Sequence, residues 1–325
     1  METSAMNSRH VHAGLLSVLA VLLMFYSMNS SDGMVGLAGM VRTAEGRQWH
    51  RYSSRSRKAG IERMQLQEMD IVEEFNSDVA PKYKVSTCVV QKSMSTVMTA
   101  IFCYLFDEDG FQQAGRELLK EIKRTRFCEN RNEARSMRSL RWHFGIRNED
   151  DWIHTMVTRD PVDRFLSGFV DKCIKMPLPG EYCNGCKANM TCFVIKEYER
   201  MVSELKKDRF TRTFEDRHFF PQNWRCELSK HMEHSRFIRY SSNATGTLLN
   251  DLFDILTQQK VENSTLEFIR NELISGRTPH STVESYARNF LEERLRSSDF
   301  LMEYIVRMFY YDFKILHYDF PLGFE

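Results

Sequence analysis

Side chains that bind anions gather in the stretch "CVVQKSMST", residues 88–96. One ammonium group and three hydroxyl groups occur there, on Lys92, Ser93, Ser95 and Thr96. The apolar runs "VSTCVV" and "VMTAIFCYLF" lie on either side of this turn, which predicts a strand, a tight polar turn and a helix. Such a turn directs backbone N–H groups, the ammonium and the hydroxyls to one point, which suits a phosphate or a sulfate group.

A second strand, turn and helix are predicted at residues 152–173, "WIHTMVTRDPVDRFLSGFVDKC". The strand should end at Thr158, Asp160 suits a helix N-cap, and Pro161 suits the first helical position. Arg159 would then follow the strand directly. Because open α/β sheets bind ligands beyond the carboxyl ends of their strands, two such turns suggest a nucleotide with phosphates at two places.

The first turn contains no glycine, so the Gly-x4-Gly-Lys-Ser/Thr pattern of P-loop nucleotidases is absent. No convincing Asp/Glu pair for Mg²⁺ accompanies it. These two features argue against a nucleotide-dependent kinase. In the plainest alternative, "QKSMST" is a solvated surface turn with an exposed lysine, and Arg159 pairs locally with Asp160 or Asp163.

The length and the charge balance limit the possible functions. With 325 residues, 42% of them hydrophobic, the chain can bury a full α/β core. The 45 Lys and Arg residues nearly equal the 44 Asp and Glu residues, so no global field attracts nucleic acid. We therefore expect no nucleic-acid partner, and we expect any anionic partner to meet a local patch.

An apolar run near the N-terminus, "AGLLSVLAVLLMFYSM", predicts a signal anchor with the short N-terminal tail in the cytoplasm, as in type II membrane proteins. The run follows Arg9, and no further charge occurs until Asp32. A cleaved signal peptide and a buried helix are the alternatives. The predicted parts are a cytoplasmic tail (1–12), a transmembrane helix (13–29), a stem (30–80) and a luminal domain (81–325).

Sequons and cysteines agree with a luminal, oxidising compartment. Sequons place glycosylation acceptors at Asn189, Asn243 and Asn263. The eight cysteines are an even number, and four of them suggest a local disulfide framework or, alternatively, a zinc site: Cys183, Cys186, Cys192 and Cys226. Cys88 and Cys103 lie in apolar runs and are expected to be plain core residues.

Helical periodicity predicts further elements. Apolar spacing predicts a helix over residues 61–75 and another over residues 111–128, "FQQAGRELLKEIKRTRFC". The region from Gly246 to Phe313 is mainly helical by the same criterion.

At this point the chain resembles a known family. From about Val85 to Phe313 it is similar to Golgi carbohydrate sulfotransferases of the chondroitin 4-O-sulfotransferase type (sulfotransferase family 2), and more closely to their divergent nematode branch. The resemblance depends on the ordered signatures "QKSMST", "VTRDPVDRFLSGFVDKC", "EDRHFFPQNWRC" and "SGRTPHST". It implies a three-layer, P-loop-like α/β fold, in which helices flank a central parallel sheet, with a helical C-terminal part.

The resemblance also implies a sulfate donor, 3′-phosphoadenosine 5′-phosphosulfate (PAPS). The 5′-phosphosulfate would be bound by the first signature and the 3′-phosphate by the second. The residues that would bind the donor are Lys92, Ser93, Ser95, Thr96, Arg159 and Ser167. Two departures from the vertebrate pattern stand out: Gln91 replaces a usual proline, and Val97 to Ala100 replace a polar Asn-Trp-Lys-Arg run.

Sulfuryl transfer needs a cation for the charge that grows on the leaving oxygen and a base for the acceptor hydroxyl. Lys92 suits the first task, and no metal is required. For the base we favour His218 in "FEDRHFFPQNWRC", although spacing alone also fits a core histidine. The other candidates are Glu215, Asp216, His143 and His280.

The acceptor should be a glycan, most simply a glycosaminoglycan such as chondroitin at the 4-hydroxyl of N-acetylgalactosamine. Arg131, Arg135, Arg138 and Arg141 recur every three or four residues, so a helix would align them as an acceptor-binding stripe or a solvated face. Arg277 and His280 could close over donor or acceptor. The alternative functions are a non-catalytic luminal glycan-binding protein that kept the fold and, less favoured, the kinase.

Overall fold

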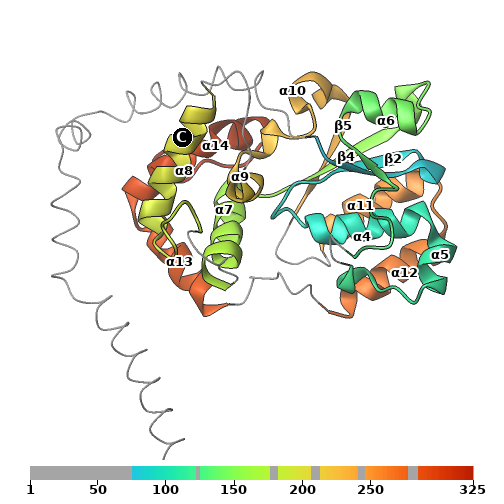
Figure 1. The fold of residues 1–325 in the computed structure, drawn as a ribbon, viewed down its shortest axis with the longest axis horizontal. Coiled ribbons are helices and arrows are strands. Elements are labelled where there is room, and N and C mark those ends of the chain that lie inside the picture. Colours follow the sequence, from blue (N-terminus) through green and yellow to red (C-terminus); the bar gives the residue numbers. More distant parts are fainter. Residues whose placement is uncertain are drawn as a thin grey trace, which may run out of the picture. The chain divides into compact units, whose positions relative to one another are not determined.

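The computed structural model describes residues 75–121, 125–175, 182–205, 213–240, 246–276 and 285–324. A mixed sheet of five strands in the order β3-β1-β2-β4-β5 lies at its centre (Figure 1). The strands are β1 (Ser77–Ala80), β2 (Val85–Cys88), β3 (Glu133–Ala134), β4 (Ile153–Thr158) and β5 (Ser235–Arg239). The predicted α/β class is therefore confirmed.

Only part of the sheet is parallel. Strands β2, β4 and β5 run parallel, whereas β1 pairs antiparallel with both β2 and β3. The short turn Pro81–Tyr83 joins β1 to β2, and so short a connection can only join antiparallel neighbours. The luminal domain was predicted to begin at Pro81. Strand β1 begins a few residues earlier, at Ser77.

Helices cover the sheet and extend beyond one end of it. They are α4 (Ser95–Phe106), α5 (Glu108–Gln113), α6 (Met137–His143), α7 (Pro161–Phe169), α8 (Met190–Glu204), α9 (Phe214–Phe219), α10 (Leu228–His231), α11 (Thr247–Gln258), α12 (Asn263–Ile274), α13 (Tyr286–Arg296) and α14 (Asp299–Ile315). The region from Gly246 to Phe313, predicted to be mainly helical, corresponds to α11, α12, α13 and α14. The predicted helix over residues 61–75 falls almost wholly outside the described residues.

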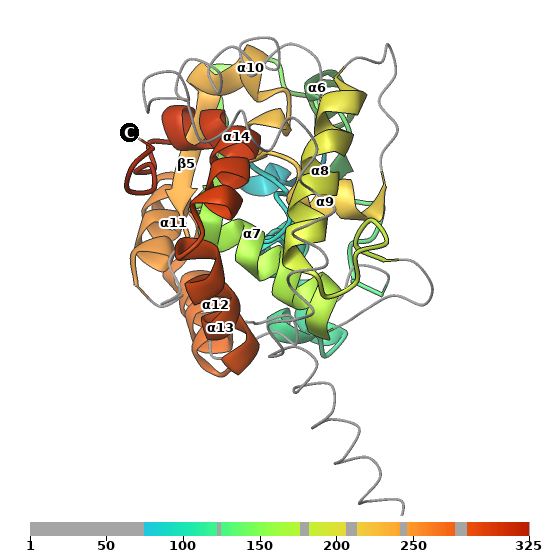
Figure 2. The same ribbon diagram turned by 90° about the vertical axis from the view of Figure 1, so that its left-hand side faces the viewer.

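The two largest apolar cores of the described residues hold most of these helices, while α6 and α10 pack in smaller clusters. One packs α4, α11 and α12 against strand residues that include Val85, Val157 and Ile238. The other joins α7, α8, α9, α13 and α14 beyond the carboxyl ends of the parallel strands (Figures 1 and 2). The predicted site edge therefore lies between the sheet and this helical cluster.

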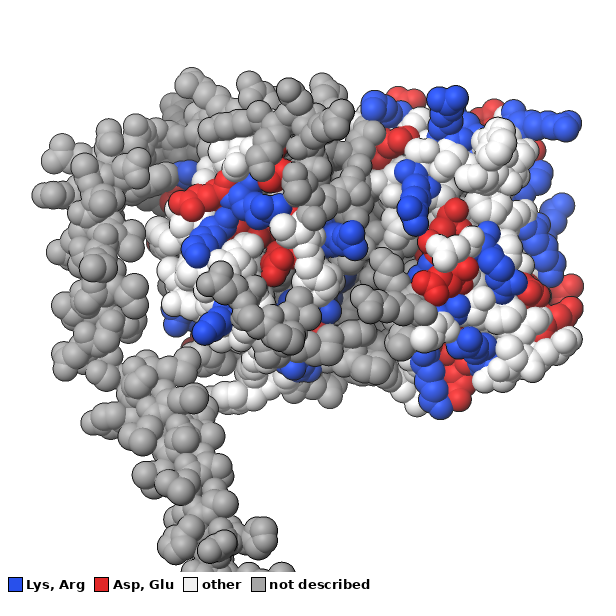
Figure 3. All heavy atoms as spheres, in the orientation of Figure 1, with Lys and Arg blue, Asp and Glu red and all other residues white. Residues whose placement is uncertain are grey.

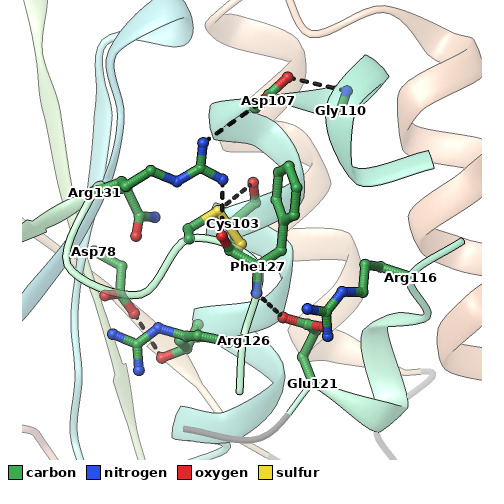
Figure 4. The surroundings of a disulfide bond; sticks show 12 residues. Asp78, Cys103, Asp107, Gly110, Arg116, Glu121, Arg126, Phe127 and Arg131 are labelled. Atoms are coloured by element: carbon green, nitrogen blue, oxygen red, sulfur yellow. Dashed lines mark hydrogen bonds and ion pairs between the residues drawn. A yellow bond between two sulfur atoms is a disulfide. The ribbon is translucent and has the colours of Figure 1, made fainter. Parts of the chain in front are cut away.

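The predicted helix over residues 111–128 and the predicted arginine stripe are wrong. Helix α5 ends at Gln113, and Gly115 then adopts a left-handed conformation with φ of 62°. Strand β3 lies between Arg131 and Arg138, so these residues do not share one helix. Instead Arg131 donates to the carbonyl of Phe127 at 2.8 Å and lies over the Phe127 ring (Figure 4).

Basic and acidic side chains are interspersed on the face shown in Figure 3, over the region of α4, α5 and α12. This mixing agrees with the nearly equal numbers of basic and acidic residues in the chain. Any cluster of basic side chains that binds an anion must therefore be local, and we expect it at the ends of the strands.

All eight cysteines form disulfides: Cys88–Cys226, Cys103–Cys128, Cys173–Cys183 and Cys186–Cys192. The prediction of plain core residues at Cys88 and Cys103 is therefore wrong (Figure 4 shows the bond of Cys103). Cys226 also does not belong to the local framework that was predicted for it. A zinc site of four thiolates is contradicted, because each of these sulfur atoms is bonded to another sulfur.

We expect the Cys88–Cys226 bond to stabilise the fold most, because it spans 138 residues whereas Cys186–Cys192 spans only 6. In the chain-entropy description, replacing both cysteines of the long-range pair by alanine lowers the free energy of unfolding by up to about 5 kcal/mol, against about 2 kcal/mol for the short pair. Denaturant titration of the two double variants measures this difference. Equal losses would contradict the expectation.

Several sequence predictions concern residues outside the described ranges. These are the cytoplasmic tail, the anchor, nearly all of the stem, Asn243, Arg277 and His280. None of the described helices is long and apolar enough to cross a membrane. Of the predicted glycosylation acceptors, Asn189 and Asn263 are described, and both are exposed.

Candidate active site

The turn after β2 has the geometry of an anion-binding loop. Lys92 and Met94 both adopt left-handed conformations, with φ of 68° and 61°. Helix α4 begins at Ser95, and the first N–H groups of a helix have no partner within it. Since these N–H groups also carry the positive end of the helix dipole, Ser95 and Thr96 lie where an anion is favoured.

Lys92 is paired and largely buried, contrary to the exposed turn lysine of the alternative reading. Its Nζ lies 2.7 Å from Oδ2 of Asp171, and the Nζ of Lys172 lies 2.9 Å from the same oxygen. The Lys92 side chain is 9% exposed and that of Asp171 is 2% exposed. Asp171 and Lys172 belong to η6 (Val170–Lys175), a π-helical continuation of α7.

Burial and charge act in opposite directions on this pair. Burial lowers the pKa of Lys92 to about 8, although the charge of Asp171 partly offsets it. Burial would raise the pKa of Asp171, but Lys92 and Lys172 together outweigh it and hold that pKa at about 2. Near neutral pH the site therefore contains the Asp171 carboxylate beside the Lys92 ammonium, with the side chain of Lys172 against the same carboxylate oxygen.

Arg159 connects the second turn to the first. Its Nη1 donates to the backbone carbonyl of Lys92 at 2.8 Å, and its guanidinium lies 4.4 Å from the ring centre of Tyr240. Its Nε pairs with Oδ2 of Asp163 at 2.6 Å, so the local ion pair of the alternative reading also occurs. The structure thus brings Lys92 and Arg159 together at one edge of the sheet.

The predicted start of α7 is confirmed. Strand β4 ends at Thr158, and the side chain of Asp160 accepts a hydrogen bond from the backbone N–H of Asp163 at 2.8 Å. Pro161 occupies the first helical position. The N-cap and the proline therefore fix the position of Arg159 between β4 and α7.

Gln222 is a buried glutamine that the sequence analysis did not identify, and it holds the two turns in position relative to each other. Oε1 of Gln222 accepts hydrogen bonds from the Ser93 hydroxyl (3.0 Å) and from the Arg159 N–H (2.9 Å). Its own N–H donates to the fully buried Asp312 at 2.8 Å. The hydroxyl of Ser93 is therefore used within the protein. Gln222 lies in the signature "EDRHFFPQNWRC", but the sequence alone does not show that this signature folds next to Arg159.

His218 lies on α9 in a half-buried position. Its Nδ1 is 2.8 Å from the carbonyl oxygen of Phe214. Because a carbonyl only accepts, Nδ1 carries the proton and Nε2 has a free lone pair. Burial, together with charge repulsion from Lys172 and Lys92, lowers the pKa of His218 to about 3. His218 is therefore neutral near pH 7 and lies within electrostatic reach of Lys92.

The carboxylates beside His218 are engaged elsewhere. Both oxygens of Asp216 pair with the guanidinium of Arg200 at 2.6 Å. Glu215 accepts from the backbone N–H of Cys183 at 3.1 Å. Of these three candidates for the base, His218 alone combines a free lone pair with the neighbouring lysines.

The packing of α7 against α9 sets the position of His218. A Cβ atom at Gly168 would lie 2.8 Å from the ring of Phe219, so only glycine allows this approach. Ser167, the other residue predicted to bind the 3′-phosphate, precedes Gly168 and is buried on α7.

Arg138, Arg141 and His143 do not join this site. They lie on α6, which precedes β4, and Arg141 pairs with Glu149 in the short turn before that strand. Arg159 follows the other end of β4, and Figure 1 shows α6 and α7 at opposite ends of the sheet.

A family model described as "Sulfotransferase family" matches residues 75–319. The chain belongs to the sulfotransferase family. The match takes in every element of the site, from β1 to α14, and the protein is a sulfotransferase enzyme. In the region of this match, Lys92, Arg159 and His218 are the residues whose geometry suits transfer of an anionic group.

Three relatives from Caenorhabditis elegans resemble this sulfotransferase. An uncharacterized protein, C18B2.2, is 48% identical over 248 residues, which cover 76% of this chain and 70% of the relative. The protein vep-2 is 45% identical over 219 residues, 66% of this chain and 68% of the relative. Carbohydrate sulfotransferase chst-1 is 35% identical over 252 residues, 74% of each chain. No solved structure matches.

In this sulfotransferase we expect Asp171→Asn to shift the alkaline limit of kcat/KM to lower pH. Lys92 must stay protonated to act as a cation, and its pKa of about 8 already reflects the opposing effects of burial and of Asp171. Without the carboxylate, Lys172 and Arg159 still repel the Lys92 charge, so its pKa falls further. A shift of about one pH unit or more is expected in pH–rate profiles.

The matched control for this variant is Asp151→Asn, which removes the exposed partner of Lys84, 3.2 Å away at the other end of the sheet. Its profile should remain that of the unmodified enzyme. An Asp171→Asn profile that lost activity equally at every pH would contradict the assignment of Lys92 as the titrating group.

Proposed function

We propose that the protein is a PAPS-dependent carbohydrate O-sulfotransferase of the Golgi lumen, and that its acceptor is chondroitin at the 4-hydroxyl of N-acetylgalactosamine. The observation that supports it most is the contact of Arg159 with the backbone of Lys92, because it joins two cationic turns at the carboxyl ends of neighbouring strands. A nucleotide with a 5′-phosphosulfate and a 3′-phosphate has anionic groups at two such places.

The residues present fit this donor. The start of α4 offers backbone N–H groups, and Ser95 and Thr96 offer half-exposed hydroxyls. When bound, PAPS supplies the sulfuryl group and a phosphate leaving group. The ammonium of Lys92 would neutralise the charge that develops on the oxygen between phosphorus and sulfur. Nε2 of His218 would accept the proton of the sugar hydroxyl that attacks the sulfur.

Packing accounts for one departure from the vertebrate pattern. Val97, Met98 and Ala100 are 6%, 2% and 0% exposed and belong to the core shared by α4 and α11. Their apolar character stabilises α4 without removing Lys92 or Thr96. A glycan acceptor is supported by the relative named as a carbohydrate sulfotransferase.

The proposed location is the Golgi lumen, with residues 13–29 as a type II signal anchor. Four disulfides are typical of proteins in oxidising compartments. Asn189 and Asn263 are exposed, as acceptors of N-linked glycans must be.

The test is transfer of labelled sulfate from PAPS by the full-length protein to desulfated chondroitin, dermatan and heparan in parallel. Label on chondroitin, recovered as 4-sulfated disaccharide after digestion, is the expected result. Label on another glycan would overturn the acceptor and keep the reaction. Binding of the donor without transfer to any glycan would favour a non-catalytic glycan-binding protein.

A further inference from the structure

Arg288 on α13 has a buried nitrogen without a partner. The residue is 6% exposed, and its Nη1 makes no hydrogen bond within the described part of the chain. A buried polar atom that lacks a partner costs free energy, more so on a charged group. Nearly all such atoms in native proteins are satisfied, so this nitrogen calls for a ligand or another explanation.

The position of Arg288 suggests the ligand. Its Nη2 pairs with Oδ1 of Asp163, while Arg159 pairs with Oδ2 of the same carboxylate at 2.6 Å. Two guanidinium groups, one from the turn after β4 and one from α13, therefore share one carboxylate. Helix α13 packs directly against α7 and η6, so Arg288 reaches the turn where Arg159 lies.

The neighbouring carboxylates are already used. Asp160 caps α7, and Glu292 lies 2.9 Å from Nε of Arg296 and 3.8 Å from Nη2 of Arg288. Among the described residues, neither supplies a partner for Nη1 of Arg288. An external anion at this point would satisfy it.

We propose that Arg288 is a further donor-binding residue, whose Nη1 binds the 3′-phosphate of the donor beside Arg159. This inference rests on the proposed use of PAPS. A phosphate monoester presents three oxygens, which suits two planar guanidinium groups better than one. Asp163 keeps the two groups together before the donor binds.

The test compares two nucleotides that differ only in the 3′-phosphate: 3′-phosphoadenosine 5′-phosphate and adenosine 5′-phosphate. Calorimetric titration of the full-length protein should show tighter binding of the first. Arg288→Lys, which keeps the charge and most of the stem, should weaken binding of the first nucleotide about tenfold or more and leave binding of the second unchanged. Arg288→Gln should weaken it further.

The control is Arg296→Lys on the same helix, an exposed position where neither affinity should change. The thermal midpoint of each variant, with and without nucleotide, separates binding from folding. The inference is wrong if Arg288→Lys keeps the full preference for the 3′-phosphorylated nucleotide, or if it weakens binding of both nucleotides equally. Either result would leave the assignment of the donor unchanged. If the unmodified protein does not prefer the 3′-phosphorylated nucleotide, both the donor assignment and the inference fall.

Discussion

Replacement of Lys92 by alanine is expected to reduce sulfate transfer by about 100- to 1,000-fold, the usual loss when one preorganised donor to a developing charge is removed. Lys92 is the cation at the turn that precedes α4, and it is held there by Asp171 at 2.7 Å. Its removal takes away the one ammonium group of the turn formed by residues 91–94. Initial rates with saturating donor measure the effect.

The fold should tolerate this change. Burial already disfavours the charged form of Lys92, as its pKa of about 8 indicates, and Asp171 keeps Lys172 at 2.9 Å when Lys92 is gone. The thermal midpoint of Lys92→Ala should therefore stay close to that of the unmodified enzyme. Transfer at the normal rate would exclude Lys92 from the mechanism.

Lys84→Ala provides a matched control. Lys84 also adopts a left-handed conformation, with φ of 51° against 68° for Lys92, so alanine meets a similar backbone at both positions. It lies just before β2, whereas Lys92 follows that strand, and it pairs with the exposed Asp151. If Lys92→Ala loses activity and Lys84→Ala does not, the loss comes from the place of Lys92 after β2 and not from the removal of any turn lysine.

The edge of the sheet that holds this lysine could be predicted because its signals are local. An apolar run, a polar turn and a second apolar run specify β2 and α4 without knowledge of the rest of the chain. The same is true of α7, where Asp160 and Pro161 mark the first turn. Parallel strands then place both turns at one edge, which is a rule of topology.

The partners of these turns could not be predicted, because they come from distant parts of the sequence. Asp171 follows Lys92 by 79 residues, and Gln222 precedes Asp312 by 90. Periodicity gives the face of a helix but not its neighbour in space. The failure of the arginine stripe has the same origin, since pairing of β3 with β1 overrides a helical spacing.

The disulfides show the limit of counting cysteines. Spacing favoured a cluster near Cys186, yet Cys226 bonds to Cys88 across 138 residues. That bond joins the end of β2, four residues before Lys92, to the segment just after Gln222. The long-range bond therefore supports the same two turns that Gln222 connects, so the anion-binding turn is fixed covalently on one side and by hydrogen bonds on the other.

Replacement of His218 by alanine is expected to lower kcat by about 100- to 10,000-fold, the range for loss of a positioned base, with little change in the KM of the donor. Phe214 fixes the proton on Nδ1 and leaves Nε2 free. Because burial and the two lysines lower the pKa of His218 to about 3, the base form already predominates in the free enzyme across the range of about pH 5 to 8. The kcat/KM profile should therefore show no acid limb from His218 in that range.

The kcat profile should differ. A bound anionic donor neutralises Lys92 and Lys172, which removes their share of the depression and raises the pKa of His218 in the complex. The acid limb of kcat should thus lie at higher pH than that of kcat/KM, and it should disappear in His218→Ala. His143→Ala, on exposed α6 at the other end of the sheet, is the control and should keep both profiles. If His218→Ala keeps full activity, the base must be sought outside α9, because Asp216 and Glu215 are engaged in other contacts.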